Sequence, residues 1–213
     1  MKNHYDFVTG EEYGELPLLG AINLAVETYR GEHVFSHSKH IEIFKANPNS
    51  FFFAMDTLTK KVVGCIVAIP VKDDFFNRTI SPDFNEDELS KDVIASSKSP
   101  GVRKLYFCSI TCDQKSSDRV RILSGLMRKF ISFYGERLLE GCKVTEVSAM
   151  AVSAAGAHLC EMMGLTKISE HQDGHSVYKL SNLSKKIYDN HLTNVQKNVV
   201  LRDVIRRTRT GAA

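Results

Sequence analysis

The sequence lacks any apolar run long enough to cross a membrane. None of its segments reaches the roughly 18 consecutive apolar residues from which a transmembrane helix is built. Its start, MKNHYDFVTGEEYGEL, also lacks the basic and then apolar pattern of a secretory signal peptide. We therefore expect a cytoplasmic protein without a membrane-embedded part.

The sequence has no CxxC motif and an odd number of cysteines, five in all. Most of them lie in apolar segments, which favours reduced, buried thiols in a cytoplasmic protein over a disulfide framework. Cys108 and Cys112 form a CxxxC pair without a second pair of ligands, so we expect no zinc site there.

No internal repeat is visible, and the composition is that of a globular protein, with 43% hydrophobic and 25% charged residues. The length of 213 residues fits one domain. The net charge of +3 is unevenly distributed, because Ser184–Arg209 contains seven Lys/Arg and two Asp. That segment carries +5 and the rest of the chain −2. We therefore expect a domain over 1–183 and a basic helical tail over 184–213.

Hydrophobic periodicity predicts an order of elements in which hairpins come early and helices alternate with strands later. This order is typical of an α/β (α+β) fold with a mixed sheet and helices on both faces. The less regular segment 71–100 should hold one short helix and a loop. The expected strands are 3–8, 51–57, 61–70, 102–112, 144–152, 165–170 and 175–180, and the expected helices are 16–29, 36–44, 117–138 and 153–163.

The polar loop CDQKSSDRV joins the strand 102–112 to the long helix, along which apolar residues from Val120 to Leu138 form a stripe. A helix N-terminus presents unpaired amides and a partial positive charge, and small residues let a phosphate approach them. The loop is also consistent with an ordinary solvated turn whose Ser and Asp residues cap the helix.

The segment SAAGAHLCEMMGL predicts a helix with Ser153 as its N-cap and Gly164 in the left-handed conformation after its end. If the strands 102–112 and 144–152 are neighbours that move apart, their free backbone could pair with an extended ligand. The small residues 153–156 would leave room for that ligand.

Three segments of the chain, the two just described and an earlier hairpin, resemble the GNAT acetyltransferase superfamily, and the resemblance covers roughly residues 5–180. The hairpin NPNSFFFAMDTLTKKVVGCIVAIP resembles the hairpin of that family. LYFCSITCDQKSSDRVRILSGLM resembles its central strand and pyrophosphate loop, and AVSAAGAHLCEMMGL resembles its last helix. The order and spacing of the three segments also agree with the family.

The resemblance implies acetyl-CoA or another acyl-CoA as co-substrate and an amine as acceptor. Amides of the pyrophosphate loop would hold the phosphates, backbone groups of the central strand would pair with the pantetheine arm, and the amine would attack the acyl group directly. The cofactor-binding residues implied are Ile110, Thr111, Cys112, Lys115, Ser116, Ser117, Asp118, Arg119, Val120, Ser153 and Gly156.

The sequence departs from the family pattern at several positions. The loop has no glycine, Ser153 stands where the family has asparagine, and Cys160 stands where it has the tyrosine that reprotonates the leaving thiolate. We take Cys160, Tyr106 and Cys108 as candidate catalytic residues, of which the last two share a strand face by alternation. A core role is the alternative for all three. The segment 71–100 should wall the acceptor pocket.

The histidines and the tail leave further alternatives. His33, His37 and His40 have helical spacing, but Ser36 starts the helix after His33, so we expect no metal site. His171 and His175 flank a QDG turn and should lie at the surface. The tail could dock on the body or form a homodimer, which we favour over contact with nucleic acid. A catalytically inactive module that binds acyl-CoA or acts as an adaptor is the alternative function.

Overall fold

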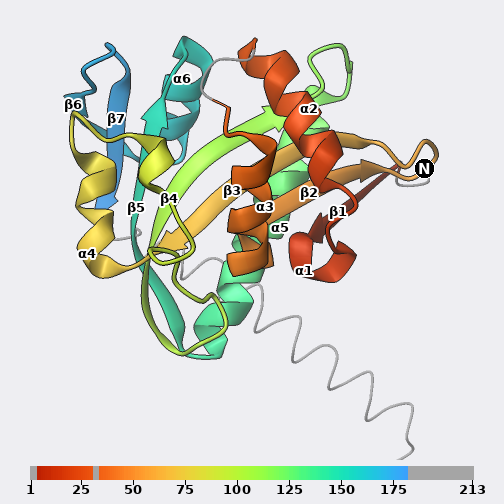
Figure 1. Ribbon diagram of the computed structural model, residues 1–213. Coiled ribbons are helices and arrows are strands. Elements are labelled where there is room, and N and C mark those ends of the chain that lie inside the picture. The colour runs from red at the N-terminus through yellow and green to blue at the C-terminus, as the bar shows by residue number, and fades with distance from the viewer. Residues whose placement is uncertain (1–3, 31–33, 182–213) are drawn as a thin grey trace, which may run out of the picture.

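A computed structural model describes residues 4–30 and 34–181 of the chain. Seven strands form one sheet, and helices lie on both of its faces (Figure 1). In chain order the elements are β1 (Tyr5–Thr9), α1 (Gly10–Tyr13), α2 (Leu18–Tyr29), α3 (His37–Ala46), η1 (Pro48–Ser50), β2 (Phe51–Asp56), β3 (Val62–Val71), α4 (Asp73–Phe76), η2 (Arg78–Ile80), η3 (Glu86–Glu88), β4 (Gly101–Cys112), α5 (Arg119–Leu139), β5 (Cys142–Ala151), α6 (Ala154–Met162), β6 (Thr166–Glu170) and β7 (Ser176–Ser181).

The strands are arranged in the order β1-β2-β3-β4-β5-β7-β6. All neighbouring pairs are antiparallel except β4 and β5, which are parallel and connected by the long helix α5. A parallel pair needs such a crossover, whereas antiparallel strands can be joined directly by a short turn, as β2 and β3 are, and β6 and β7. The predicted mixed sheet is therefore confirmed, as is the adjacency of its two βα units.

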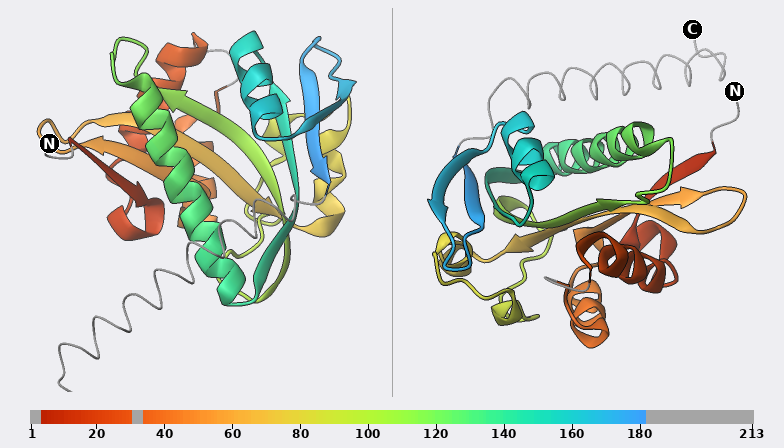
Figure 2. Two further views of the ribbon diagram at one scale, coloured as in Figure 1. Left: turned by 180° about the vertical axis from the view of Figure 1, so that it is seen from behind. Right: turned by 90° about the horizontal axis from the view of Figure 1, so that it is seen from above.

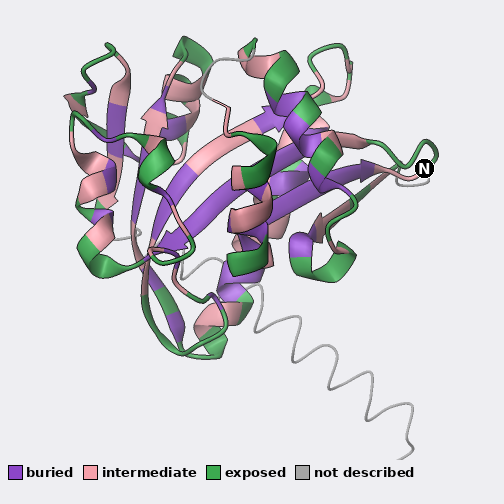
Figure 3. Ribbon diagram, in the orientation of Figure 1, coloured by how far each residue is buried: buried purple, intermediate pink, exposed green. Residues whose placement is uncertain are grey.

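Two buried clusters lie on opposite faces of the sheet. The view from above shows α5 and α6 on one face and α1 to α3 on the other (Figure 2). Side chains of α5, β4 and β5 form the first cluster, and side chains of α2, α3, β3 and the segment 76–94 form the second. The central strands are buried from both sides, while the loops at the sheet ends are exposed (Figure 3). This accounts for the nearly continuous apolar sequence of β2 and β3.

Local signals for helix ends are confirmed. The hydroxyl of Ser36 accepts a hydrogen bond from the amide of Lys39 (3.2 Å), and the hydroxyl of Ser153 accepts one from Gly156 (3.1 Å). Gly164 has a φ of +84°, the left-handed conformation expected after α6. These helix caps can be predicted from the sequence because each involves residues only a few positions apart.

Two sequence expectations about the elements are wrong in detail, and one short helix has no counterpart among them. The segment 71–100 holds a four-residue α-helix and two 3₁₀-helices instead of one helix. The helix α1 was not predicted, because four residues are too few for periodicity to register. In α5, Val120 of the predicted stripe is 80% exposed. Ile122 and Leu126, which lie beside that stripe on the helix surface, are buried instead. The true core face of α5 is therefore rotated from the predicted stripe.

The predicted tail helix over 184–213 lies outside the described residues. Within the described ranges, no helix combines the length and apolarity that crossing a bilayer requires.

Candidate active site

The central feature of the site is the divergence of β4 and β5. Their pairing ends at Phe107 and Ala149, although β4 continues to Cys112 along its other neighbour, β3. The two strands visibly move apart toward their C-terminal ends (Figure 1). A cavity of about 310 Å³ lies there, bordered by both strands, α5 and the start of α6. The predicted slot between the strands is thus present.

A β-bulge in β4 sits at the point of divergence. Val67 pairs with Ser109 and Ala68 with Phe107, so Cys108 is the extra residue of β4. A bulge leaves its extra residue unpaired and bends the strand. It also shifts the alternation of side chains between the two sheet faces. As a result, Phe107 and Ile110, three positions apart, pack against the same core cluster. Simple alternation along the sequence misses this change.

The structure brings together only some of the predicted site residues. Both Tyr106 and Thr111 are buried and lie outside the cavity lining, and the loop 115–120 borders it only through its neighbour Gln114. The predicted residues that line the cavity are Cys108, Ile110, Cys112, Ser153, Gly156 and Cys160.

A carboxylate that the sequence analysis missed, Glu86, also lines the cavity. It belongs to η3, within the segment 71–100 that was expected to wall the acceptor pocket. The hydroxyl of Tyr106 donates a hydrogen bond to its Oε1 atom, and the thiol of Cys108 donates to the same atom at 3.8 Å. The predicted shared face of Tyr106 and Cys108 is therefore real, and Glu86 is the group they meet there.

The surroundings of Glu86 favour its protonated form more than water does. Burial raises the pKa of its carboxyl group to about 7, and the hydrogen bonds from Tyr106 and Cys108 limit the rise. A carboxylate with a pKa near neutrality is suited to accept a proton in catalysis. Perturbed carboxyl groups in a cavity are candidate functional groups on that physical ground.

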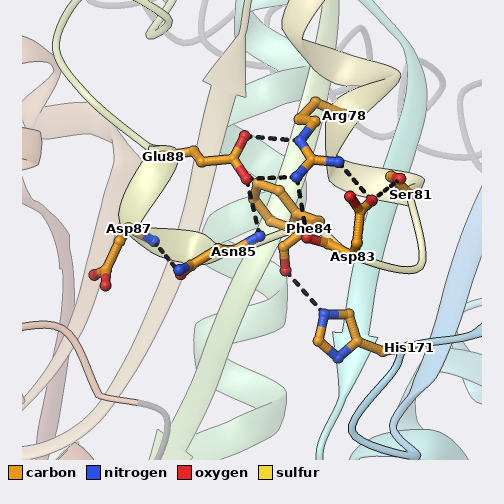
Figure 4. A network of polar contacts seen from close by, with 8 residues as sticks. All are labelled: Arg78, Ser81, Asp83, Phe84, Asn85, Asp87, Glu88 and His171. Atoms are coloured by element: carbon orange, nitrogen blue, oxygen red, sulfur yellow. Dashed lines mark hydrogen bonds and ion pairs between the residues drawn. The ribbon is translucent and has the colours of Figure 1, made fainter.

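The loop that carries Glu86 is held by a network around Arg78 (Figure 4). The guanidinium group of Arg78 donates two hydrogen bonds to the carboxylate of Glu88, both of 2.7 Å, and one of 2.6 Å to Asp83. The side chain of Asn85 accepts a hydrogen bond from the amide of Asp87 at 2.9 Å. Bidentate pairing fixes geometry more strictly than a single ion pair.

His171 is a second anchor of this loop, and its expected place at the surface is wrong. Its side chain is buried, and its Nε2 atom lies 2.9 Å from the carbonyl oxygen of Phe84, also visible in Figure 4. The amide of Gln172 donates to the carbonyl of Pro82 at 2.8 Å. The turn between β6 and β7 is thus covered by the 82–84 segment, which no local sequence signal indicates.

The start of α6 forms the wall of the cavity opposite β4. Ser153, Ala155 and Gly156 line it with small side chains, as the sequence analysis expected. Cys160, one turn further along, is buried and also lines the cavity. Burial raises the pKa of its thiol to about 11, so the group keeps its proton at neutral pH.

The loop before α5 is ordered by its own hydrogen bonds. The amide of Lys115 donates to the side chain of Asp113 at 2.8 Å, and the amide of Ser116 donates to the carbonyl of Asp113 at 3.2 Å. The amide of Asp118 donates to the hydroxyl of Ser116 at 3.1 Å. Three of the amides predicted to bind pyrophosphate therefore already have acceptors inside the loop.

The first backbone amides of α5 have no acceptor within the helix. The amide of Ile122 donates to the carbonyl of Asp118 (2.9 Å), so the amides of Arg119 and Val120 precede it without an intrahelical acceptor. The carboxylate of Asp118 makes no capping bond and accepts a hydrogen bond from the hydroxyl of Tyr5 at 3.0 Å. Tyr5 belongs to β1, an edge strand distant in sequence.

No arrangement of metal ligands accompanies these groups. Within residues 4–30 and 34–181, no three His, Cys, Asp or Glu side chains are placed to hold a metal ion. His40 is instead buried, with its Nδ1 atom 3.1 Å from the carbonyl oxygen of Ser36.

Comparison with solved structures gives the fold its class. An N-acetyltransferase from Staphylococcus aureus Mu50 aligns over 84% of this chain and 99% of its own, with a TM-score of 0.51 and 11% identity. A GNAT-family acetyltransferase from Bacillus anthracis aligns over 85% of this chain and 96% of its own (TM-score 0.43, 11% identity). The Escherichia coli ribosomal-protein-S18-alanine N-acetyltransferase aligns over 84% and 95% (TM-score 0.48, 11% identity). The alignment with the S. aureus enzyme shows that the chain has the GNAT fold, the fold of that N-acetyltransferase.

Sequence comparison adds no relative at this level of divergence. No protein-family model matches the chain. No curated protein matches it either.

Proposed function

We propose that the protein is an acyl-CoA-dependent N-acyltransferase that transfers an acetyl group from acetyl-CoA to an amine. One observation carries the proposal: the cavity between the diverging β4 and β5 contains the carboxylate of Glu86, whose pKa is raised to about 7. The fold that the chain shares with the S. aureus N-acetyltransferase is consistent with this activity.

The donor would lie along the edge of β4 that β5 leaves. Backbone groups of residues 108–112, which β5 does not pair, can bind the pantetheine arm as an added strand would. Two of these groups, the carbonyls of Ile110 and Cys112, also accept hydrogen bonds from the side chains of Tyr29 and Gln114. The small residues at the start of α6 leave space on the other side. The pyrophosphate would lie at the N-terminus of α5, where the amides of Arg119 and Val120 and the helix dipole attract an anion.

The chemistry would then require two proton transfers. Glu86 accepts the proton of the amine as its nitrogen attacks the thioester carbonyl, and the C–S bond to coenzyme A breaks as the amide forms. Cys160 is the candidate donor of a proton to the departing thiolate, because its thiol is protonated at neutral pH and lines the cavity.

Thermal unfolding with and without acetyl-CoA tests the proposal most directly. A ligand that binds only the folded state stabilises it by mass action, by about 2.7 kcal/mol at 100 times Kd. Release of free thiol with a panel of amines then measures turnover. No stabilisation at millimolar acetyl-CoA would refute the proposal, whereas binding without turnover on any amine would support the inactive acyl-CoA-binding alternative.

The substitution Cys160→Ala should lower the turnover rate by about 10²-fold, because a general acid contributes at least that much. The binding of acetyl-CoA, followed by thermal shift, should not change. The rate is measured by thiol release at saturating acetyl-CoA. Turnover equal to that of the wild type would remove Cys160 from the mechanism.

The substitution Tyr5→Phe should weaken acetyl-CoA binding by about two- to tenfold, the range expected for one hydrogen bond. Without the hydroxyl of Tyr5, the carboxylate of Asp118 can turn toward the pyrophosphate and repel it. KM for acetyl-CoA should rise while kcat stays the same.

The double variant Tyr5→Phe/Asp118→Asn provides the control for this prediction. It removes the repelling charge, so KM should return to the wild-type value or below it. A KM that stays high in the double variant would mean that Tyr5 acts through β1 packing instead.

The cytoplasmic location, the homodimer and the role of the tail stay predictions. The same holds for the domain boundary after residue 183, because the tail lies outside the described residues.

A further inference from the structure

Cys108 occupies the same position toward Glu86 that the proposed function gives to the attacking amine. Its thiol lines the cavity and donates a hydrogen bond to Oε1 of Glu86 at 3.8 Å. The same oxygen accepts a hydrogen bond from the buried hydroxyl of Tyr106. The three side chains form a nucleophile, a base and a group that orients the base, an arrangement typical of covalent catalysis.

The backbone places this thiol where a bound thioester would lie. Cys108 is the bulged residue at the point where β5 leaves β4, so it marks the inner end of the unpaired β4 edge. Among the five cysteines, which are all free thiols, it is the one whose hydrogen bond goes to a carboxylate. Cys160 lines the same cavity from α6 without such a partner.

We propose that Cys108 is an acyl-acceptor site, which takes the acyl group from bound acyl-CoA when no amine is present. The inference rests on the proposed function, because it needs acyl-CoA in the cavity. It adds a covalent step that the direct transfer to an amine does not require.

The step exchanges one thioester for another. Glu86 accepts the thiol proton while the sulfur of Cys108 attacks the acyl carbonyl carbon. The bond between that carbon and the coenzyme A sulfur breaks, and the departing thiolate takes the proton from Glu86. The products are S-acyl-Cys108 and free coenzyme A, and no atom changes its oxidation state. Because burial raises the pKa of the Cys108 thiol, the proton has to leave during the attack and not before it.

The product remains a thioester, which amines can cleave. An amine entering the cavity would attack the acyl carbon of S-acyl-Cys108, and the thiol of Cys108 would be regenerated. The adduct should therefore accumulate with acetyl-CoA alone and disappear when an accepted amine is added.

Intact-protein mass spectrometry of the full chain with acetyl-CoA alone tests the inference. We expect one acetyl group per chain, removal of this group by neutral hydroxylamine, and release of one coenzyme A thiol. Peptide mapping of the wild type should place the acetyl group on Cys108, so the test does not depend on a variant that folds.

Three variants refine the result. Cys108→Ala should carry no acetyl group, whereas Cys65→Ala, which removes a fully buried thiol outside the cavity lining, should still carry one. Glu86→Gln should slow the acetylation by about 10²-fold, the contribution expected of a general base.

The outcomes separate the inference from the proposed function. Stabilisation by acetyl-CoA together with acylation of amines, but without a hydroxylamine-sensitive adduct on Cys108, would overturn the inference alone. An acetyl group mapped to another residue would overturn it as well. Absence of any stabilisation by acetyl-CoA would overturn the proposed function and the inference with it.

Discussion

Replacing Glu86 with glutamine should lower the rate of amine acylation by about 10²–10⁴-fold, the range that a positioned general base contributes. Glutamine keeps the shape of the side chain and can still accept the hydrogen bond from Tyr106, but it cannot take up a proton. The loop and the cavity should therefore stay intact. Turnover is measured by thiol release, and binding of acetyl-CoA is measured separately by thermal shift and should not change.

The pH dependence of the wild-type enzyme gives a second readout of Glu86. Because the base must be ionised and its pKa is raised to about 7, the rate should rise with pH through about 7 and then level off. The hydrogen bond from Tyr106 lowers this pKa, so Tyr106→Phe should move the rise to higher pH. Such a shift would identify Tyr106 as a group that positions and tunes the base from outside the cavity.

Asp87→Asn is the matched control, because it removes the same charge at the next residue of the same loop. Asp87 is exposed, and its own amide, not its carboxylate, contributes the bond to Asn85. This variant should retain near wild-type turnover. If Glu86→Gln and Asp87→Asn lower the rate equally, the effect comes from the charge or order of the loop, and Glu86 is not the base.

Replacing Gly125 with alanine should destabilise the protein by about 1–3 kcal/mol, the usual cost of overpacking a close-packed interior. Gly125 lies in α5, and a Cβ atom there would come within 2.0 Å of Cζ of Phe7 on β1. The helix propensity of alanine exceeds that of glycine by about 1 kcal/mol, so a net loss would mean that the clash is the larger effect. Urea denaturation followed by circular dichroism measures the change.

Two further variants test this explanation. Ser124→Ala changes an exposed neighbour in the same helix and should leave stability unchanged or slightly higher. In the background of Phe7→Leu, Gly125→Ala should cost less than in the wild type, because contacting residues do not act additively. Equal costs in both backgrounds would exclude the contact with Phe7 as the cause.

The sequence alone determined the features that depend on near neighbours in the chain. Apolar periodicity placed most helices and strands, Ser153 and Gly164 marked the ends of α6, and short connections implied that the two βα units are adjacent. Six of the predicted site residues line the cavity because they belong to those two units. Helix and strand propensity, helix capping and side-chain alternation each depend on residues a few positions apart, so a single sequence is enough to predict them.

Only the tertiary structure decided which groups meet across the fold. Glu86 reaches the cavity through an irregular segment, and its partner Tyr106 is 20 positions away. The ring of His171 contacts the carbonyl of Phe84, 87 positions away in the sequence. The hydroxyl of Tyr5 donates a hydrogen bond to the carboxylate of Asp118, 113 positions away. The bulge at Cys108 depends on the register with β3, not on β4 alone. Such contacts arise from packing between distant segments, for which a single sequence holds no periodic or local signal.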